Sequence, residues 1–208
     1  MKSFLESKWF DFFIICVRIS MIRLFLGYGW TKLTENQFGV SPEVLLTPLK
    51  DLSLFQVGWY LFDHQPFKFI IGISQIICAL LLVFNRTVII GTLMFIVITF
   101  NILIIDETIM PDVMRIPFRH RLLTYIALAF VILYHYRERF LPAIKIILSK
   151  YQQKIKVKFW WFLLIPVGLI LVELISVFVS IIIKFITDYN SAVSSVSEMF
   201  NFLLDKIK

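Results

Sequence analysis

The amino-acid sequence predicts an all-α protein, a polytopic bundle of transmembrane helices with amphipathic helices at the membrane surface. The chain is 59% hydrophobic, whereas soluble domains average about 45–50%. Several apolar stretches approach the ~20 residues that a helix needs to cross a hydrocarbon core. Only two of the 208 residues are cysteine. A disulfide-stabilised scaffold is therefore excluded, and the high apolar content excludes intrinsic disorder.

The net charge is +7, with 21 Lys and Arg residues against 14 Asp and Glu residues. In a soluble chain such an excess would suggest nucleic acid as a partner. Here the basic residues flank apolar stretches. We therefore expect them to meet membrane lipids, including anionic headgroups, and we expect no nucleic acid.

The first expected span covers residues 9–33 and contains Arg18 and Arg23. It is too long for the apolar core of a signal peptide and lacks a small-residue cleavage site, so we expect it to remain in the mature protein. The stretch that follows, residues 34–66, has a capping residue before each of Pro42 and Pro48. This pattern predicts short helices that form an outer cap.

Four further spans are expected at residues 67–84, 87–105, 122–136 and 159–183. The fourth is short, but the arginines that flank it can extend to the two interfaces. The fifth is the longest and carries Glu173 near its middle.

Residues 140–158 show apolar side chains at helical spacing, with basic side chains off that face. The pattern is typical of a helix that lies in the membrane interface and directs its lysines toward lipid headgroups. The sequence thus divides into a core at 1–139, which includes the cap at 34–66, this interfacial helix, a fifth transmembrane helix at 159–186 and an amphipathic tail at 187–208. The lysines expected at the lipid surface are Lys145, Lys150, Lys154, Lys156 and Lys158.

The orientation follows from the positions of the basic residues. Seven of them lie within residues 137–158, and cytoplasmic loops carry the excess of Lys and Arg. We therefore expect the N-terminus to be cytoplasmic and the C-terminus to lie outside.

Five of the polar residues in the expected spans fall into two layers. By a rise of ~1.5 Å per residue, Arg23, Asn101 and Glu173 share one depth, and Arg18 and Gln75 share another. Each ionisable side chain at mid-membrane costs about 2.5–3.5 kcal/mol, so it needs a partner. These two polar layers form either a pocket for a headgroup, a quinone ring or a proton, or a structural lock between helices. We favour the lock, and we expect Arg23→Leu to lower the melting temperature more than any ligand affinity.

A cluster of charges is expected at the outer mouth of the bundle. A metal site from Asp106, Glu107 and His120 is conceivable, but no paired-histidine spacing supports it, so we expect interfacial salt bridges and no metal. The charged residues of this cluster are Asp106, Glu107, Asp112, Arg115, Arg119 and Arg121.

Cys16 and Cys78 do not form a C-x-x-C motif and both fall in expected hydrocarbon. We interpret them as packing residues, because a reactive thiol needs exposure and a lowered pKa. The sequence shows no nucleotide-binding or nucleophile-elbow motif. It predicts no catalytic residue and no intrinsic cofactor.

Residues 23–33 read Arg-Leu-Phe-Leu-Gly-Tyr-Gly-Trp-Thr-Lys-Leu, which resembles the opening signature of the DoxX family of small bacterial membrane proteins. The second span also resembles that family, through Gly72, the leucines at 80–82, Asn85-Arg86-Thr87 and Gly91. The resemblance covers roughly residues 10–136 and implies a four-helix bundle in the bacterial inner membrane. Family members often carry a glutamate where this chain has Gln75.

The string also makes physical sense. Gly27 lies one turn after Arg23, and it leaves room for a helix or a ligand beside the guanidinium. Gly29 and Lys32 mark the end of the span, where the lysine is expected to reach the headgroups.

Three functions remain open. The leading hypothesis is a non-catalytic accessory or anchoring subunit that binds another membrane or envelope protein through the added fifth span and amphipathic helices. The alternative, implied by the family, is a quinone-binding subunit of the thiosulfate:quinone oxidoreductase type, with Arg23, Asn101 and Glu173 around a borrowed quinone or lipid. A small-molecule transporter comes third, because no inverted repeat is visible.

Overall fold

A computed structural model of the chain describes residues 8–34, 37–149 and 159–187, together with Tyr189, Val193 and Ser197. These residues are predominantly helical and include no β-strand. The chain divides into two compact units, Met1–Ser149 and Lys150–Lys208. The predicted all-α class is therefore confirmed.

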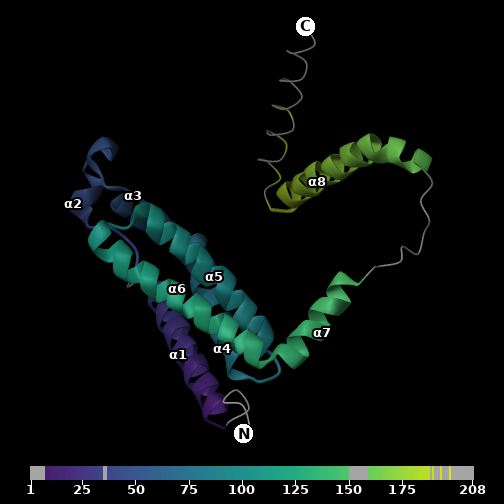
Figure 1. The fold of residues 1–208 in the computed structure, drawn as a ribbon. Coiled ribbons are helices and arrows are strands. Elements are labelled where there is room, and N and C mark those ends of the chain that lie inside the picture. The colour runs from purple at the N-terminus through teal and green to yellow at the C-terminus, as the bar shows by residue number, and fades with distance from the viewer. Residues whose placement is uncertain are drawn as a thin grey trace. The chain divides into compact units, whose positions relative to one another are not determined.

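Among the described residues, the first unit contains seven α-helices and one short 3-10 helix, and the second contains a 3-10 helix followed by a long α-helix (Figure 1). In chain order the elements are α1 (Lys8–Leu33), α2 (Pro42–Leu45), η2 (Leu49–Asp51), α3 (Leu54–Phe62), α4 (Phe67–Val83), α5 (Val88–Ile109), α6 (Asp112–His135), α7 (Arg137–Leu148), η3 (Phe159–Leu164) and α8 (Ile165–Thr187).

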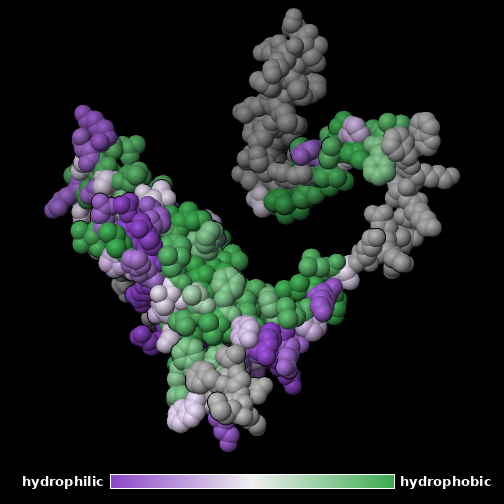
Figure 2. Space-filling model, in the orientation of Figure 1, coloured by the Kyte–Doolittle hydropathy of each residue, from purple (hydrophilic) through white to green (hydrophobic). Residues whose placement is uncertain are grey.

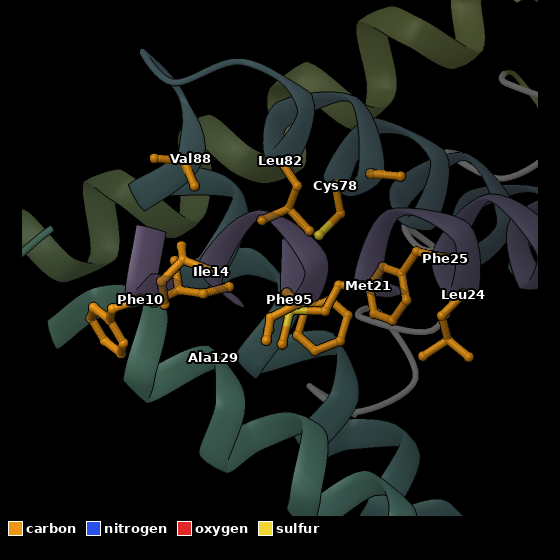
Figure 3. Close-up of a cluster of buried hydrophobic side chains, with 13 residues drawn as sticks. Phe10, Ile14, Met21, Leu24, Phe25, Cys78, Leu82, Val88, Phe95 and Ala129 are labelled. Carbon is orange, nitrogen blue, oxygen red and sulfur yellow. The ribbon is translucent and has the colours of Figure 1, made fainter. Parts of the chain in front are cut away.

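Four helices of the first unit, α1, α4, α5 and α6, pack side by side as a bundle. On α1 the buried side chains recur every three or four residues, so one face of the helix enters the core. The rings of Phe25 on α1 and Phe95 on α5 stack with centroids 4.3 Å apart. Figure 3 shows this apolar cluster, which on α1 extends from Phe10 to Phe25.

Glycine allows α1 and α4 to approach closely. A Cβ atom at Gly29 would lie 2.8 Å from the backbone oxygen of Gly72 and 2.8 Å from Cγ1 of Ile76. Small residues at such crossings let helix backbones come together inside membranes. At Gly27, two residues earlier, the same Cβ atom would meet nothing within 4 Å.

Three helical segments are long and apolar enough to cross a membrane: α5, α6 and Phe162–Val179 within η3 and α8. The segments α3 and α4 would make a fourth span if the pair, bent by 78°, were counted as one. These findings are consistent with a membrane protein. Helix α1 carries Asp11, Arg18 and Arg23 and is not among the three. The five-span topology therefore stays a prediction.

The two ends of the bundle carry different elements. We call the end with α2, η2 and α3 the cap end, and the end with residues 84–87 and Tyr136 the turn end. Figure 2 shows hydrophilic side chains gathered around α2 at the cap end, and hydrophobic side chains over much of the exposed surface of α8. Within the cap, α2 begins at Pro42, and Ser53 and Gln56 form a reciprocal capping box at the start of α3.

The expected surface elements are described only in part. Helix α7 ends at Leu148 and carries an exposed Lys145. The remaining expected lipid-surface lysines, Lys150, Lys154, Lys156 and Lys158, lie outside the described residues. Most of the expected tail at 187–208 does so as well.

Candidate functional site

Arg18 is buried, with 6% of its surface exposed, and it holds the turn end of the bundle together. Its Nε and Nη2 atoms donate to the Leu82 carbonyl oxygen at 3.1 and 2.8 Å, and Nη2 also donates to the Val83 carbonyl oxygen at 2.9 Å. Its Nη1 atom donates to Asn85 Oδ1 at 2.6 Å and to the Tyr136 hydroxyl at 3.1 Å. The last carbonyls of α4 have no partner within the helix, and positive charge suits a helix C-terminus. Arg18 therefore acts as a structural lock that joins α1 to the ends of α4 and α6.

The expected layer of Arg18 and Gln75 does not form. All five hydrogen bonds of Arg18 lead to residues 82–136. Gln75 is fully buried, and neither its Nε2 nor its Oε1 atom has a hydrogen-bond partner among the described residues. The rise per residue predicts the depth of Arg18 and Gln75 along their helices but not the direction in which their side chains point. The layer does not form because the two side chains point to different neighbours.

The structure also corrects the expected second layer within the first unit. Arg23 and Asn101 are both exposed, and the Asn101 amide donates to the Val97 carbonyl oxygen of its own helix at 2.9 Å. Arg23 follows Arg18 by five residues, which turns it about 140° around the helix axis. Glu173 belongs to the second unit and is exposed there. Its place beside Arg23 stays a prediction.

The unpartnered Gln75 amide gives a testable expectation. A buried polar group without a hydrogen bond costs about 1–3 kcal/mol, so we expect Gln75→Leu to raise the free energy of unfolding by about 1 kcal/mol in thermal melts in mild detergent. Thr92→Val is the matched control, because the buried Thr92 hydroxyl is bonded to the Val88 carbonyl oxygen at 2.7 Å. This control should bring no gain. A large loss of stability in Gln75→Leu would contradict the expectation.

A second buried polar group lies at the cap end. Lys32 and Asp106 are 4% and 7% exposed, and the Asp106 carboxylate attracts Lys32 electrostatically. The Lys32 Nζ atom donates to Gln37 Oε1 at 2.9 Å and lies 5.4 and 5.3 Å from the ring centroids of Tyr28 and Phe38. Lys32 was expected to reach the headgroups. It is instead enclosed, because the cap segment folds over it.

Hydrogen bonds and an aromatic contact hold the cap segment next to Lys32. The Trp59 indole nitrogen donates to the Gln37 carbonyl oxygen at 3.0 Å, and the Trp59 ring meets the Phe38 ring edge-on at 5.6 Å. Gly39 takes a positive φ of 103° and donates its backbone N–H to the Trp59 carbonyl oxygen. These contacts tie the start of the cap to α3.

The charge cluster expected at the outer mouth forms two ion pairs near the start of α6. Arg119 binds Glu107 with two hydrogen bonds of 2.6 Å, and Arg115 pairs with Asp112 one turn away. Asp106 is buried and takes part in neither of these two ion pairs. No group of three or more potential metal-binding side chains occurs in the part of the chain that the structure describes.

A groove of about 540 Å³ runs between α1 and α6. The sequence did not predict this α1–α6 groove, because its residues come from helices about 100 positions apart. The only local signal was the spacing of Cys16, Ser20, Arg23 and Gly27, which places them along one side of α1. The groove is lined by Phe13, Cys16, Val17, Ser20, His120, Arg121, Thr124, Tyr125 and Leu128.

The two cysteines have different surroundings. Cys16 is exposed at the α1–α6 groove, whereas Cys78 is buried and its thiol donates to the Gly91 carbonyl oxygen at 3.4 Å. Both are free. The interpretation as a packing residue fits Cys78. It does not fit Cys16, because the groove leaves that side of α1 open.

The polar side of the α1–α6 groove faces the cap end. Ser20 lies beyond Phe13 in that direction on α1, and on the antiparallel α6 the cap-side residues are His120 and Arg121. The Arg121 guanidinium lies 5.8 Å from the centroid of the Tyr125 ring. Arg23 is exposed one turn beyond Ser20. The groove therefore joins a cationic end to an apolar end.

An alignment over 91 positions, which covers 40% of this chain, is 34% identical to the uncharacterized protein YwoB of Bacillus subtilis (strain 168). The match spans 57% of the length of that protein. No family model and no solved structure matches the chain.

Proposed function

We propose that this chain is a DoxX-like integral protein of the bacterial cytoplasmic membrane that serves as a non-catalytic accessory or anchoring subunit. Its N-terminus is cytoplasmic and its C-terminus lies outside. The proposal rests mainly on α8, an apolar helix of 23 residues on which every side chain that the structure describes is exposed within its own unit. The structural role of Arg18 supports it, because the five hydrogen bonds of this buried guanidinium serve the fold rather than chemistry.

Glu173 makes α8 more than a lipid anchor. It lies in the middle of the apolar segment Phe162–Val179, and a carboxylate at that depth costs about 2.5–3.5 kcal/mol unless a polar group meets it. A second membrane protein with a polar or basic side chain on a facing helix would supply that group. In this proposal α8 is the docking helix, and Glu173 selects the partner.

The test is native mass spectrometry of the full chain, extracted in mild detergent from its own membrane. We expect a stoichiometric protein partner, and we expect Glu173→Leu to reduce its retention by about tenfold or more, since a charge-assisted hydrogen bond is worth ~1.5–3 kcal/mol. Glu138→Leu is the control, because Glu138 is an exposed carboxylate on α7. A chain that carries no protein partner, or equal retention in both variants, would count against the anchoring role.

A quinone-binding subunit is the second candidate, supported by the α1–α6 groove, whose polar and apolar ends suit an amphiphile. Titration with a ubiquinone or menaquinone analogue should then quench Trp30, which is 64% exposed on α1, or shift the reduction potential of the quinone. No change in either quantity would remove this candidate.

A further inference from the structure

We propose that the α1–α6 groove binds an anionic phospholipid, with the phosphate held by Arg23 and Arg121 and an acyl chain lying along the apolar half. The inference uses only the first unit of the chain, and it stands whether or not α8 binds a partner protein.

The first argument is charge. On α6, Arg115 and Arg119 are each paired with a carboxylate. Arg23 and Arg121 have no carboxylate partner within the part of the chain that the structure describes, and the Arg121 guanidinium lies 5.8 Å from the centroid of the Tyr125 ring. A guanidinium beside apolar helices is costly unless an anion meets it. A guanidinium group binds a phosphate through two parallel hydrogen bonds, and phosphate is the anion that phospholipids carry.

The second argument is position. Ser20 and Arg121 both line the cap side of the groove. Arg23 stands one turn beyond Ser20 in the same direction, and no atom lies within 4 Å of a Cβ atom built at Gly27, one further turn along. Arg121 thus lines the cap side of the groove, and the exposed Arg23 lies about one helical turn beyond that side on α1. The exposed Ser20 hydroxyl adds a further hydrogen-bond donor.

The third argument is shape. Toward the turn end, the groove is lined by Phe13, Val17 and Leu128, which offer only apolar surface. Its volume of about 540 Å³ lies within the range of small-molecule sites. An anionic phospholipid matches this arrangement, because its charged headgroup is followed by an apolar acyl chain. A neutral quinone ring would fill the same space but would leave both guanidinium charges without an anion.

The experiment uses the full chain, delipidated in detergent and titrated with phosphatidylglycerol or with phosphatidylcholine of the same acyl chains. Bound lipid is counted by native mass spectrometry. We expect phosphatidylglycerol to bind about tenfold more tightly, and we expect Arg23→Gln and Arg121→Gln each to weaken it by about tenfold. Ser20→Leu keeps both charges but fills the groove, so it should also weaken binding.

Arg137→Gln is the matched control. Arg137 is also exposed and lies over a tyrosine, 4.8 Å from the ring centroid of Tyr134, but at the turn end. It should leave phosphatidylglycerol binding unchanged, and melting temperatures should show that all variants fold. Equal binding of the two lipids, equal loss in Arg137→Gln, or displacement of the lipid by a neutral quinone would overturn the proposal. Equal competition by soluble glycerol phosphate would overturn the acyl-chain half of the site.

Discussion

Arg18→Leu lowers the free energy of unfolding by roughly 3 kcal/mol and strongly reduces the amount of folded protein in the membrane. The substitution removes five hydrogen bonds at once, and polar contacts between membrane helices average ~0.6 kcal/mol each. It also leaves the last carbonyls of α4 without donors. Thermal unfolding in mild detergent, followed by tryptophan fluorescence, measures the loss.

Arg23→Leu is the matched control, because it removes the same charge from the same helix. Arg23 is exposed, so its loss should change stability far less than the loss of Arg18. The sequence predicted a loss of thermal stability for Arg23→Leu. From the structure, we expect that loss for Arg18→Leu instead. If Arg18→Leu does not accumulate, Tyr136→Phe removes one of the five bonds and should cost about 0.6 kcal/mol. Equal losses in the two leucine variants would contradict the lock.

Gly29→Ala destabilises the bundle by about 1–3 kcal/mol, the usual range for overpacking. The added methyl group would lie 2.8 Å from the Gly72 carbonyl oxygen and 3.3 Å from the Ile76 backbone nitrogen. Backbone atoms cannot rotate away as a side chain can. Helices α1 and α4 must therefore move apart, and the melting temperature should fall.

Gly27→Ala provides the comparison, since a methyl group there meets nothing within 4 Å. Alanine is preferred over glycine inside a helix, so stability should stay unchanged or rise slightly. Both variants add one methyl group to α1, two positions apart. An equal fall in melting temperature in both variants would show that the close approach of α1 and α4 at Gly29 does not determine the loss of stability.

Much of the helical layout could be predicted because apolar runs mark helices. The second span was expected at 67–84, and α4 covers Phe67–Val83. The helix ends were predicted less well where a helix continues into polar residues. Helix α6 begins at Asp112 rather than near 122, and α5 extends to Ile109. The additional helical turns contain Glu107, Arg115 and Arg119. A search for apolar runs stops at such charged residues and therefore missed these turns.

The buried contacts were harder to predict, because depth along a helix does not determine direction around it. Arg18, Arg23 and Asn101 all fell within expected spans, yet only Arg18 is buried. Lys32 was expected at the headgroups because the sequence cannot show that the cap folds over it. The α1–α6 groove was missed for a related reason. The residues that line it form no recognisable motif on either helix alone. They form a groove only where α1 and α6 pack together.

The partners of Arg18 impose an order on the making of the protein. Leu82 is 64 residues away along the chain and Tyr136 is 118 residues away. At ~5–20 residues per second, the ribosome needs roughly 6–24 s after Arg18 to reach Tyr136. The acceptors at the end of α4 are made after about half of that interval, and the Tyr136 hydroxyl is made last. The arginine that stabilises the finished bundle therefore leaves the first helix without its full set of hydrogen bonds until the last helix of the bundle has been made.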